Sequence, residues 1–276
     1  MRSEMSNTRL ACIGSGFMGE ALIRGILAAG VYAPDEVCVS DISTARLAVL
    51  ASLGVRTTQE NAEAVAGAET VLLAVKPQVI GQVLEGLRPH LSPDTLVLSI
   101  AAGVSLATLE GKLAPGTPVV RAMPSLLATA RAAATALAPG SAAGADHLER
   151  AERIFGAVGT AVRVEERLLN AVTGVSGSGP AYLCLVIEAL ADAGVQAGLT
   201  REIAQQLAAQ TVMGTGKLIL ESGQHPAEVK DRVSSPGGTT IAAVRALERA
   251  GLRAALMDAV DAAVTRAAEL ERAAAK

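Results

Sequence analysis

Short apolar runs alternate with segments of helical periodicity along the first half of the chain. The runs at 9–14, 37–40, 55–57, 70–75, 96–100 and 118–122 are typical of strands, and the fully apolar run at 70–75 is typical of a buried parallel strand. Between them, apolar positions recur every three or four residues and predict helices at 20–29, 44–53, 62–66, 79–87 and 106–113. Strands that alternate with helices pair in parallel. We therefore predict an α/β fold with a doubly wound parallel sheet.

The second half has a different pattern. Residues 130–145 are rich in alanine and glycine and predict loops and a strand edge, followed by a helix at 147–157 and a last strand at 162–164. Beyond Glu165 the pattern is helical, at 181–194, 200–222, 226–233, 240–250 and 252–272. We predict two domains, 1–166 with the sheet and 167–276 with helices alone.

The segment 174–194 joins the two patterns. Ser178 or Gly179 is suited to cap a helix in which Pro180 takes the first position. Residues 176–179 are predicted to form a flexible loop whose N–H groups could bind an anion or a cofactor edge, although a simple capped core helix would have the same sequence. Residues 181–187 are apolar on every face, so this helix should be buried in a core or between subunits. A helical domain of about 100 residues cannot bury such helices alone, so we expect a dimer.

A glycine-rich turn follows the first predicted strand. Gly14, Gly16 and Gly19 have the GxGxxG spacing and lead directly into a helix. Gly14 would permit the tight turn, Gly16 the approach of a pyrophosphate, and Gly19 the packing of the helix on the strand. This context predicts a Rossmann dinucleotide-binding domain.

Asp41 ends the second predicted strand, 22 residues after Gly19. A carboxylate at this place can bond both ribose hydroxyls of NAD and would repel the additional phosphate of NADP. The sequence therefore favours NADH slightly, and NADPH stays open because Ser40, Ser43 and Arg46 could bond a phosphate. Alternatively, Asp41 only caps the helix at 44–53.

Ligands of such sheets bind at the carboxyl ends of the strands. The candidate lining residues therefore follow successive strands, at 14–18, 40–41, 74–77, 101–104 and 123–125. Lys76 belongs to this set, although a solvated loop lysine is the simpler interpretation.

Composition narrows the possible partners and compartment. Half of the 276 residues are hydrophobic and 1% are aromatic, and the net charge is −3 without a basic stripe, so we expect no nucleic-acid partner. Cys12, Cys38 and Cys184 lie apart in apolar runs, which predicts buried thiols, no metal site and a reducing cytoplasm. Residues 168–187 lack charge over a length that could span a bilayer, but their polar residues, glycines and Pro180 argue against a membrane span.

A second candidate site lies between two predicted helices, at 234–240. Its sequence, Ser-Ser-Pro-Gly-Gly-Thr-Thr, presents N–H groups and hydroxyls to a small anion such as a carboxylate. An ordinary interhelical turn with a threonine cap is the alternative.

Together these segments resemble pyrroline-5-carboxylate reductases over nearly the whole chain. The matching stretches are 14–19, 74–77, 101–104, 172–182 and, most specifically, 233–241. The resemblance implies NAD(P)H-dependent reduction of 1-pyrroline-5-carboxylate, a small molecule, to L-proline, with a helical domain that forms dimers and often decamers. It assigns the dinucleotide contacts to Gly14, Ser15, Gly16, Phe17, Met18, Ser40, Asn61, Ala74, Val75, Lys76, Pro77, Ala101, Ala102 and Gly103, to which the strand-end argument adds Asp41.

The same resemblance assigns the substrate carboxylate and ring nitrogen to Ser235, Gly237, Gly238, Thr239 and Thr240. A protonated cyclic imine already accepts hydride well, so the site needs to orient it and requires no strong acid or base. Thr240 is the predicted hydrogen-bond partner of the ring nitrogen, in an orienting role.

Two departures from the family pattern bear on the site. Members usually have Asn-Thr-Pro where this chain has Ser125, Leu126 and Leu127, which removes polar groups and a rigid proline near the reacting centre. Some members have glutamate at the place of Gly223, so a polar contact to the substrate is expected to be missing here.

Two other functions are compatible with this plan of domains. A different imine reductase or a β-hydroxyacid dehydrogenase would share it, but the dehydrogenase would need a lysine in the first long helix of the second domain, and 183–193 contains none. A dinucleotide-binding homologue with weak catalysis is the other, supported by the altered loop at 125–127.

Overall fold

The computed structural model describes residues 8–274, which divide into two compact units. The first runs to Gly177 and includes the C-terminal segment from Ala263; the second is Ser178–Ala262. The predicted boundary between 166 and 167 falls inside the first unit, where Leu169 is buried in the core of that unit. That boundary stays a prediction.

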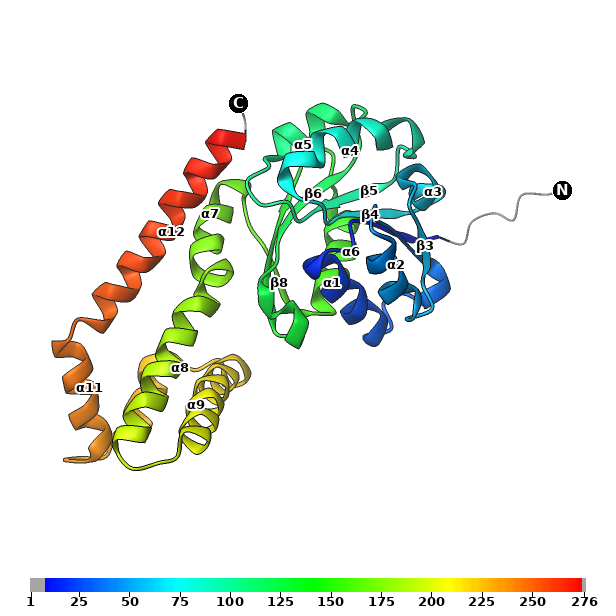
Figure 1. The fold of residues 1–276 in the computed structure, drawn as a ribbon. Coiled ribbons are helices and arrows are strands. Elements are labelled where there is room, and N and C mark those ends of the chain that lie inside the picture. The colour runs from blue at the N-terminus through cyan, green and yellow to red at the C-terminus, as the bar shows by residue number, and fades with distance from the viewer. Residues whose placement is uncertain (1–7, 275–276) are drawn as a thin grey trace. The chain divides into compact units, whose positions relative to one another are not determined.

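The first unit is built on an eight-stranded sheet in the order β3-β2-β1-β4-β5-β6-β7-β8 (Figure 1). β1 to β6 are parallel, as the alternation of strands and helices predicts. The strands are β1 (Leu10–Ile13), β2 (Val37–Ser40), β3 (Arg56–Thr58), β4 (Thr70–Leu73), β5 (Leu96–Ser99), β6 (Val119–Met123), β7 (Ala133–Pro139) and β8 (Gly159–Arg163).

The prediction was wrong for β7. Residues 133–139 form a largely buried strand inside the sheet, antiparallel to β6 and parallel to β8, rather than loops and an edge. Only the short 3-10 segment η4 (Leu126–Ala130) lies between β6 and β7, too little chain for the crossover that a parallel pair needs. Alanine has a low strand propensity, so its composition concealed the strand.

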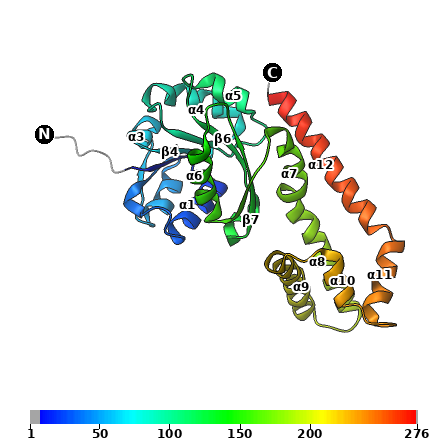
Figure 2. The same ribbon diagram turned by 180° about the vertical axis from the view of Figure 1, so that it is seen from behind.

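Helices cover both faces of the sheet because side chains of successive strand residues point to opposite faces. Leu10 and Cys12 pack in the core beneath α1, α2 and α6, whereas Ala11 and Ile13 pack in the core beneath α3, α4 and α5. Figures 1 and 2 show α4 and α5 on the face opposite α1 and α6. The helices are α1 (Phe17–Ala28), α2 (Thr44–Ala51), α3 (Asn61–Val65), α4 (Ile80–Leu87), α5 (Leu106–Lys112), α6 (Ala145–Gly156) and α7 (Leu169–Val172).

The second unit is helical, as predicted. It contains α8 (Gly179–Gln196), α9 (Arg201–Ser222), α10 (Pro226–Arg232), α11 (Thr239–Arg249) and the beginning of α12 (Leu252–Ala274). Its own core consists of three buried alanines, Ala191, Ala204 and Ala208.

The flexible loop expected at 176–179 is not observed. Thr173–Gly177 forms a π-helical turn, η6, that leads from α7 into α8, and Ser178 has helical dihedral angles with no side-chain cap. Pro180 lies in the first turn of α8, as predicted. Because the turn continues the helix, this segment does not offer the free helix N-terminus that the anion-binding hypothesis needs.

Helix α8 is largely exposed in the single chain, so of the two kinds of burial that the sequence allows, in a core or between subunits, only burial between subunits stays a prediction. Leu183, Leu185 and Leu190 are exposed by 46%, 67% and 47%. Cys184 is also exposed, so the prediction of a buried thiol holds only for Cys12 and Cys38. By length and composition alone, Glu166–Gln196 is apolar enough to cross a membrane.

Candidate functional site

The glycine-rich turn between β1 and α1 has the geometry that its sequence predicts. Gly14 has a φ of +97°, and a Cβ there would lie 2.7 Å from the Ala74 carbonyl oxygen. A Cβ on Gly19 would collide with the Gly14 carbonyl oxygen, so α1 approaches the turn closely. Above Gly16, by contrast, nothing lies within 4 Å of a Cβ position. A pyrophosphate could therefore approach the backbone of the turn closely at Gly16.

The N-terminus of α1 faces this space. Gly16 is its N-cap without a side-chain hydrogen bond, and the first intrahelical bond joins the Glu20 N–H to the Gly16 carbonyl oxygen at 2.9 Å. The N–H groups of residues 17–19 precede this bond and need an outside acceptor. Such a helix end suits a phosphate group.

Asp41 reaches from the end of β2 to the glycine-rich turn. Its Oδ2 accepts hydrogen bonds from the Ser15 N–H at 2.7 Å and the Ser15 hydroxyl at 2.8 Å, and its Oδ1 accepts from the Ser43 N–H at 2.9 Å. Partial burial raises the pKa of Asp41, but these hydrogen bonds outweigh burial and lower the pKa below its ordinary value. Asp41 is therefore charged and fixed beside the turn. It is not the cap of α2, because Ser43 takes that position.

Ser40 and Asn61 form a second contact at the same edge. The Ser40 side chain is fully buried, and its hydroxyl donates to the Asn61 Oδ1. Asn61 is the first residue of α3, so this bond joins the end of β2 to the beginning of the helix. The predicted dinucleotide contacts Ser40 and Asn61 thus lie together at the end of β2, directly before Asp41 in the chain.

A pocket of about 430 Å³ opens on the other side of the glycine-rich turn. It brings together most of the predicted dinucleotide residues at the ends of β1, β4 and β5. Ile100 also lines it and was not predicted as a contact, while Met123 and Pro124 were expected there only from their place at the end of β6. The lining residues are Gly16, Phe17, Met18, Ala74, Val75, Lys76, Pro77, Ile100, Ala101, Ala102, Met123 and Pro124.

The departures from the family pattern lie beside this pocket and in the second unit. Ser125 is 2% exposed, and its hydroxyl has no hydrogen-bond partner within the described chain. Leu126 and Leu127 point partly to the surface, with exposures of 53% and 39%. Gly223 ends α9 with a φ of +65°, a conformation that glycine adopts without strain. This backbone conformation explains why position 223 is a glycine.

The predicted substrate residues lie in the turn between α10 and α11 of the second unit. Gly237 has a φ of +67°, and a Cβ on Gly238 would collide with the Ser235 hydroxyl. Gly238 is the N-cap of α11 without a side-chain cap, and the first intrahelical bond is donated by the Ala242 N–H. The N–H groups of residues 239–241 therefore point out of the helix, as an anion site requires.

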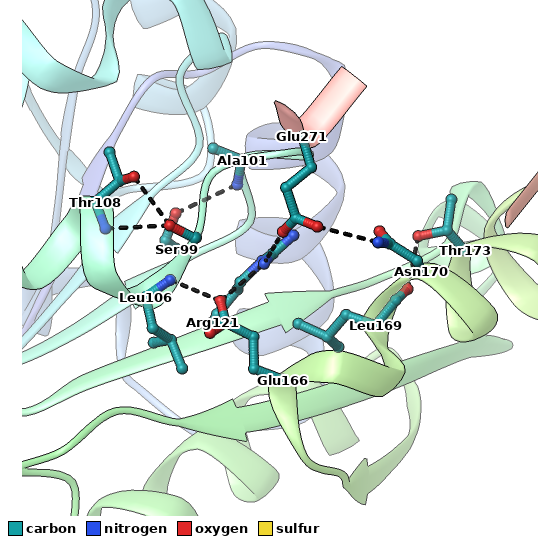
Figure 3. Close-up of polar contacts among 11 residues, drawn as sticks. Ser99, Ala101, Leu106, Thr108, Arg121, Glu166, Leu169, Asn170, Thr173 and Glu271 are labelled. Atoms are coloured by element: carbon teal, nitrogen blue, oxygen red, sulfur yellow. Dashed lines mark hydrogen bonds and ion pairs between the residues drawn. The ribbon is translucent and has the colours of Figure 1, made fainter. Parts of the chain in front are cut away.

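A buried ion cluster in the first unit was not predicted. Nη1 of Arg121 on β6 lies 2.8 Å from Glu166 Oε1 and 2.7 Å from Glu271 Oε1 (Figure 3). The Arg121 side chain is 6% exposed. Its position inside the apolar run 118–122 was the one available signal, since a buried arginine needs a partner. The described residues contain no group of three or more metal-ligating side chains.

Two parts of the chain match models of known protein families. Residues 166–270 match the family model "Pyrroline-5-carboxylate reductase dimerisation", and residues 9–103 match "NADP oxidoreductase coenzyme F420-dependent". The pyrroline-5-carboxylate reductase of Methanosarcina acetivorans is 49% identical over 267 residues, covering 96% of this chain and 99% of that protein.

Solved structures agree with the sequence relatives. A pyrroline-5-carboxylate reductase from Coxiella burnetii has a TM-score of 0.92 at 39% identity, covering 96% of this chain and 98% of that chain. A pyrroline carboxylate reductase from Plasmodium falciparum, solved with NADP bound, has a TM-score of 0.82 at 29% identity, covering 97% and 99%.

Proposed function

The chain belongs to the pyrroline-5-carboxylate reductase family, and we propose that it reduces 1-pyrroline-5-carboxylate to L-proline, the last step of proline biosynthesis. The observation that carries this proposal is the open pocket at the carboxyl ends of β1, β4 and β5, next to an uncapped helix N-terminus. The protein is thus an oxidoreductase that acts on a C=N bond.

The two sides of the glycine-rich turn suggest how a dinucleotide would be held. The N–H groups at the start of α1 would bind the pyrophosphate, and Ser40, Asp41 and Asn61 lie on the β2 side, where the adenosine ribose belongs. The nicotinamide would then occupy the pocket on the β4 and β5 side, lined by Ala74–Pro77 and Ala101. When bound, the reduced nicotinamide supplies the hydride.

The turn at 234–240 supplies groups for a carboxylate and a ring nitrogen. The N–H groups of residues 239–241 and the positive end of the α11 dipole attract the carboxylate, and the Thr240 hydroxyl orients the ring nitrogen. Within residues 8–274 neither the Thr239 nor the Thr240 hydroxyl makes a hydrogen bond to another protein group. A protonated imine carries its own electrophilic carbon, so these residues bind and orient, and they move no proton.

NADH is the preferred dinucleotide in this proposal. The carboxylate of Asp41 is fixed by Ser15 and Ser43 at the end of β2, where it can accept a ribose hydroxyl and repels an added phosphate. NADPH remains the second substrate, in keeping with the family model named for NADP and the relative solved with NADP.

A homodimer accounts for the exposed apolar face of α8. Three alanines cannot provide a core for helices that expose Leu185 and Leu220 by 67% and 80%, and the family model that covers them is one of dimerisation. We propose that a partner subunit buries this face and that the face does not insert into a membrane.

We further propose that dimers assemble into decamers and work in the cytoplasm, where the free thiols of Cys12 and Cys38 would stay reduced.

A spectrophotometric assay tests the proposed reaction. Purified protein should oxidise NADH and NADPH on addition of 1-pyrroline-5-carboxylate, with the higher kcat/KM for NADH. Protein that binds a dinucleotide but oxidises neither on this addition would contradict the proposed activity. A clear preference for NADPH would contradict only the role of Asp41.

A further inference from the structure

The ion cluster around Arg121 borders the pocket in which the nicotinamide is proposed to bind. Arg121 lies two residues before Met123, whose side chain lines this pocket. It is buried between two carboxylates, Glu166 and Glu271. A buried ion pair contributes little net stability compared with apolar residues of similar volume. Stability alone therefore does not explain why this ion cluster lies here.

Glu271 connects two further segments of the pocket region. Its Oε2 accepts a hydrogen bond from Asn170 Nδ2 on α7 at 3.0 Å. The backbone of Glu271 lies 3.8 Å from a Cβ position on Gly103, directly after the pocket residues Ala101 and Ala102. Figure 3 shows the Glu271 carboxylate between Arg121 and Asn170.

The remaining contacts extend the cluster on both sides. Glu166 Oε1 accepts from the Leu106 N–H at 2.6 Å, at the beginning of the helix that follows the turn at 101–103. On the other side, α7 leads into η6, where a Cβ on Gly177 would lie 3.4 Å from Met123 Cε. One guanidinium thus ties together β6, the start of α5, η5 (Glu166–Leu168) and α12, and through Glu271 also α7.

We propose that Arg121 and Glu271 are positioning residues for the known reaction of the family. They fix the nicotinamide end of the dinucleotide pocket. They hold the turn at 101–103 and Met123 at a set separation, and they leave the pyrophosphate site at 14–18 untouched. This inference rests on the proposed function in one respect, namely that the nicotinamide binds in this pocket.

Binding of a whole dinucleotide and of a fragment separates positioning from general support of the fold. Glu271→Gln in the full chain keeps the size of the side chain and removes its charge. We expect the Kd for NADH and NADPH to rise about tenfold, and the Kd for ADP-ribose and 2′-phospho-ADP-ribose, which lack nicotinamide, to stay at the wild-type value. Turnover with pyrroline carboxylate should fall about 10- to 100-fold because a small misplacement of reacting atoms is costly.

A matched control lies on the same helix. Glu269 pairs with Arg266 at 2.7 Å on the surface of α12, so Glu269→Gln removes an equivalent charge without touching the cluster. It should behave as wild type in every assay. Asn170→Ala, which removes one hydrogen bond to Glu271, provides a milder second variant and should shift dinucleotide binding in the same direction.

Three results would overturn the inference. If Glu271→Gln weakens the binding of dinucleotide and fragment equally, the cluster only supports the fold. If the binding of both is unchanged, the cluster does not act on the pocket. If the wild-type protein binds no dinucleotide, the premise that the nicotinamide binds in this pocket fails. Because positioning is measured by binding and the reductase activity by wild-type turnover, failure of one is distinguished from failure of the other.

Discussion

At the scale of single residues, we propose that the carboxylate of Asp41 distinguishes the two dinucleotides. Asp41→Asn keeps an oxygen that can accept from Ser15 and removes the charge that faces an added phosphate. Because like charges in contact cost more than a kilocalorie per mole, we expect kcat/KM for NADPH relative to NADH to rise about tenfold. Initial rates with both dinucleotides measure this ratio.

The control for this prediction is Asp94→Asn, an exposed carboxylate that precedes the amino end of β5, whereas Asp41 follows the carboxyl end of β2. It should leave the ratio unchanged. If Asp41→Asn also leaves the ratio unchanged, Asp41 only fixes the glycine-rich turn.

Thr240 is the second residue whose role can be isolated. Thr240→Val removes the hydroxyl and keeps the shape, so the KM for pyrroline carboxylate should rise or kcat should fall about tenfold, the value of one hydrogen bond. Dinucleotide affinity should not change. Thr215→Val is the control, since the Thr215 hydroxyl bonds the carbonyl of Thr211 in its own helix. Wild-type kinetics for Thr240→Val would show that the orienting group lies elsewhere.

Individual residues at strand ends were the most predictable part of the site. The carboxyl ends of β1, β4 and β5 lie side by side because these neighbouring strands are parallel, so 16–18, 74–77 and 101–102 meet in one pocket. The interaction of Asp41 with Ser15 was not predictable, because it depends on side-chain geometry across two loops. Whether the predicted residues contact a ligand stays a prediction.

At the scale of elements, the attachment of α12 to the sheet depends on the charge of Glu271. Burial raises the pKa of Glu271, but hydrogen bonds from Arg121 on β6 and Asn170 on α7 outweigh it and lower the pKa below the ordinary value of 4.5. Glu166 on η5 faces the same guanidinium. A carboxyl group whose pKa falls on folding stabilises the protein above its unfolded pKa, and this stabilisation is lost as pH falls through the folded pKa.

Urea unfolding at several pH values tests this linkage. The difference in free energy of unfolding between wild type and Glu271→Gln should be constant above about pH 5.5, one unit above the ordinary pKa, and should shrink below it. The same measurement on Glu269→Gln should give a small difference. A difference that grows on acidification would contradict a lowered pKa.

Two elements escaped prediction for physical reasons. β7 is built mainly of alanine, whose small side chain gives no strand signal but fits inside the sheet between β6 and β8. The segment 173–177 has the glycine and serine content of a loop, yet the hydroxyls of Thr173 and Ser176 bond the carbonyls of Leu169 and Val172 and satisfy the widened helical turn. Neither contact can be derived from local composition.

At the scale of the whole molecule, assembly should depend on the exposed face of α8. Leu185→Glu places a charge on a side chain that is 67% exposed in the single chain. Because a partner would bury this charge without a counter-ion, we expect the dimer to dissociate into monomers. Analytical ultracentrifugation measures the change. Val49→Glu is the control, because Val49 is an apolar residue of α2 that is exposed by 41%. A dimer unaffected by Leu185→Glu would exclude this face as the interface.

The central claim is hydride transfer to the imine carbon of pyrroline carboxylate. The most direct measurement is the reaction with a reduced nicotinamide that carries deuterium at both C4 positions, followed by mass spectrometry and NMR of the product. We expect L-proline with one deuterium at C5, because the cofactor transfers one of its two C4 deuterium atoms as deuteride. Absence of proline, or proline without deuterium at C5, would contradict it.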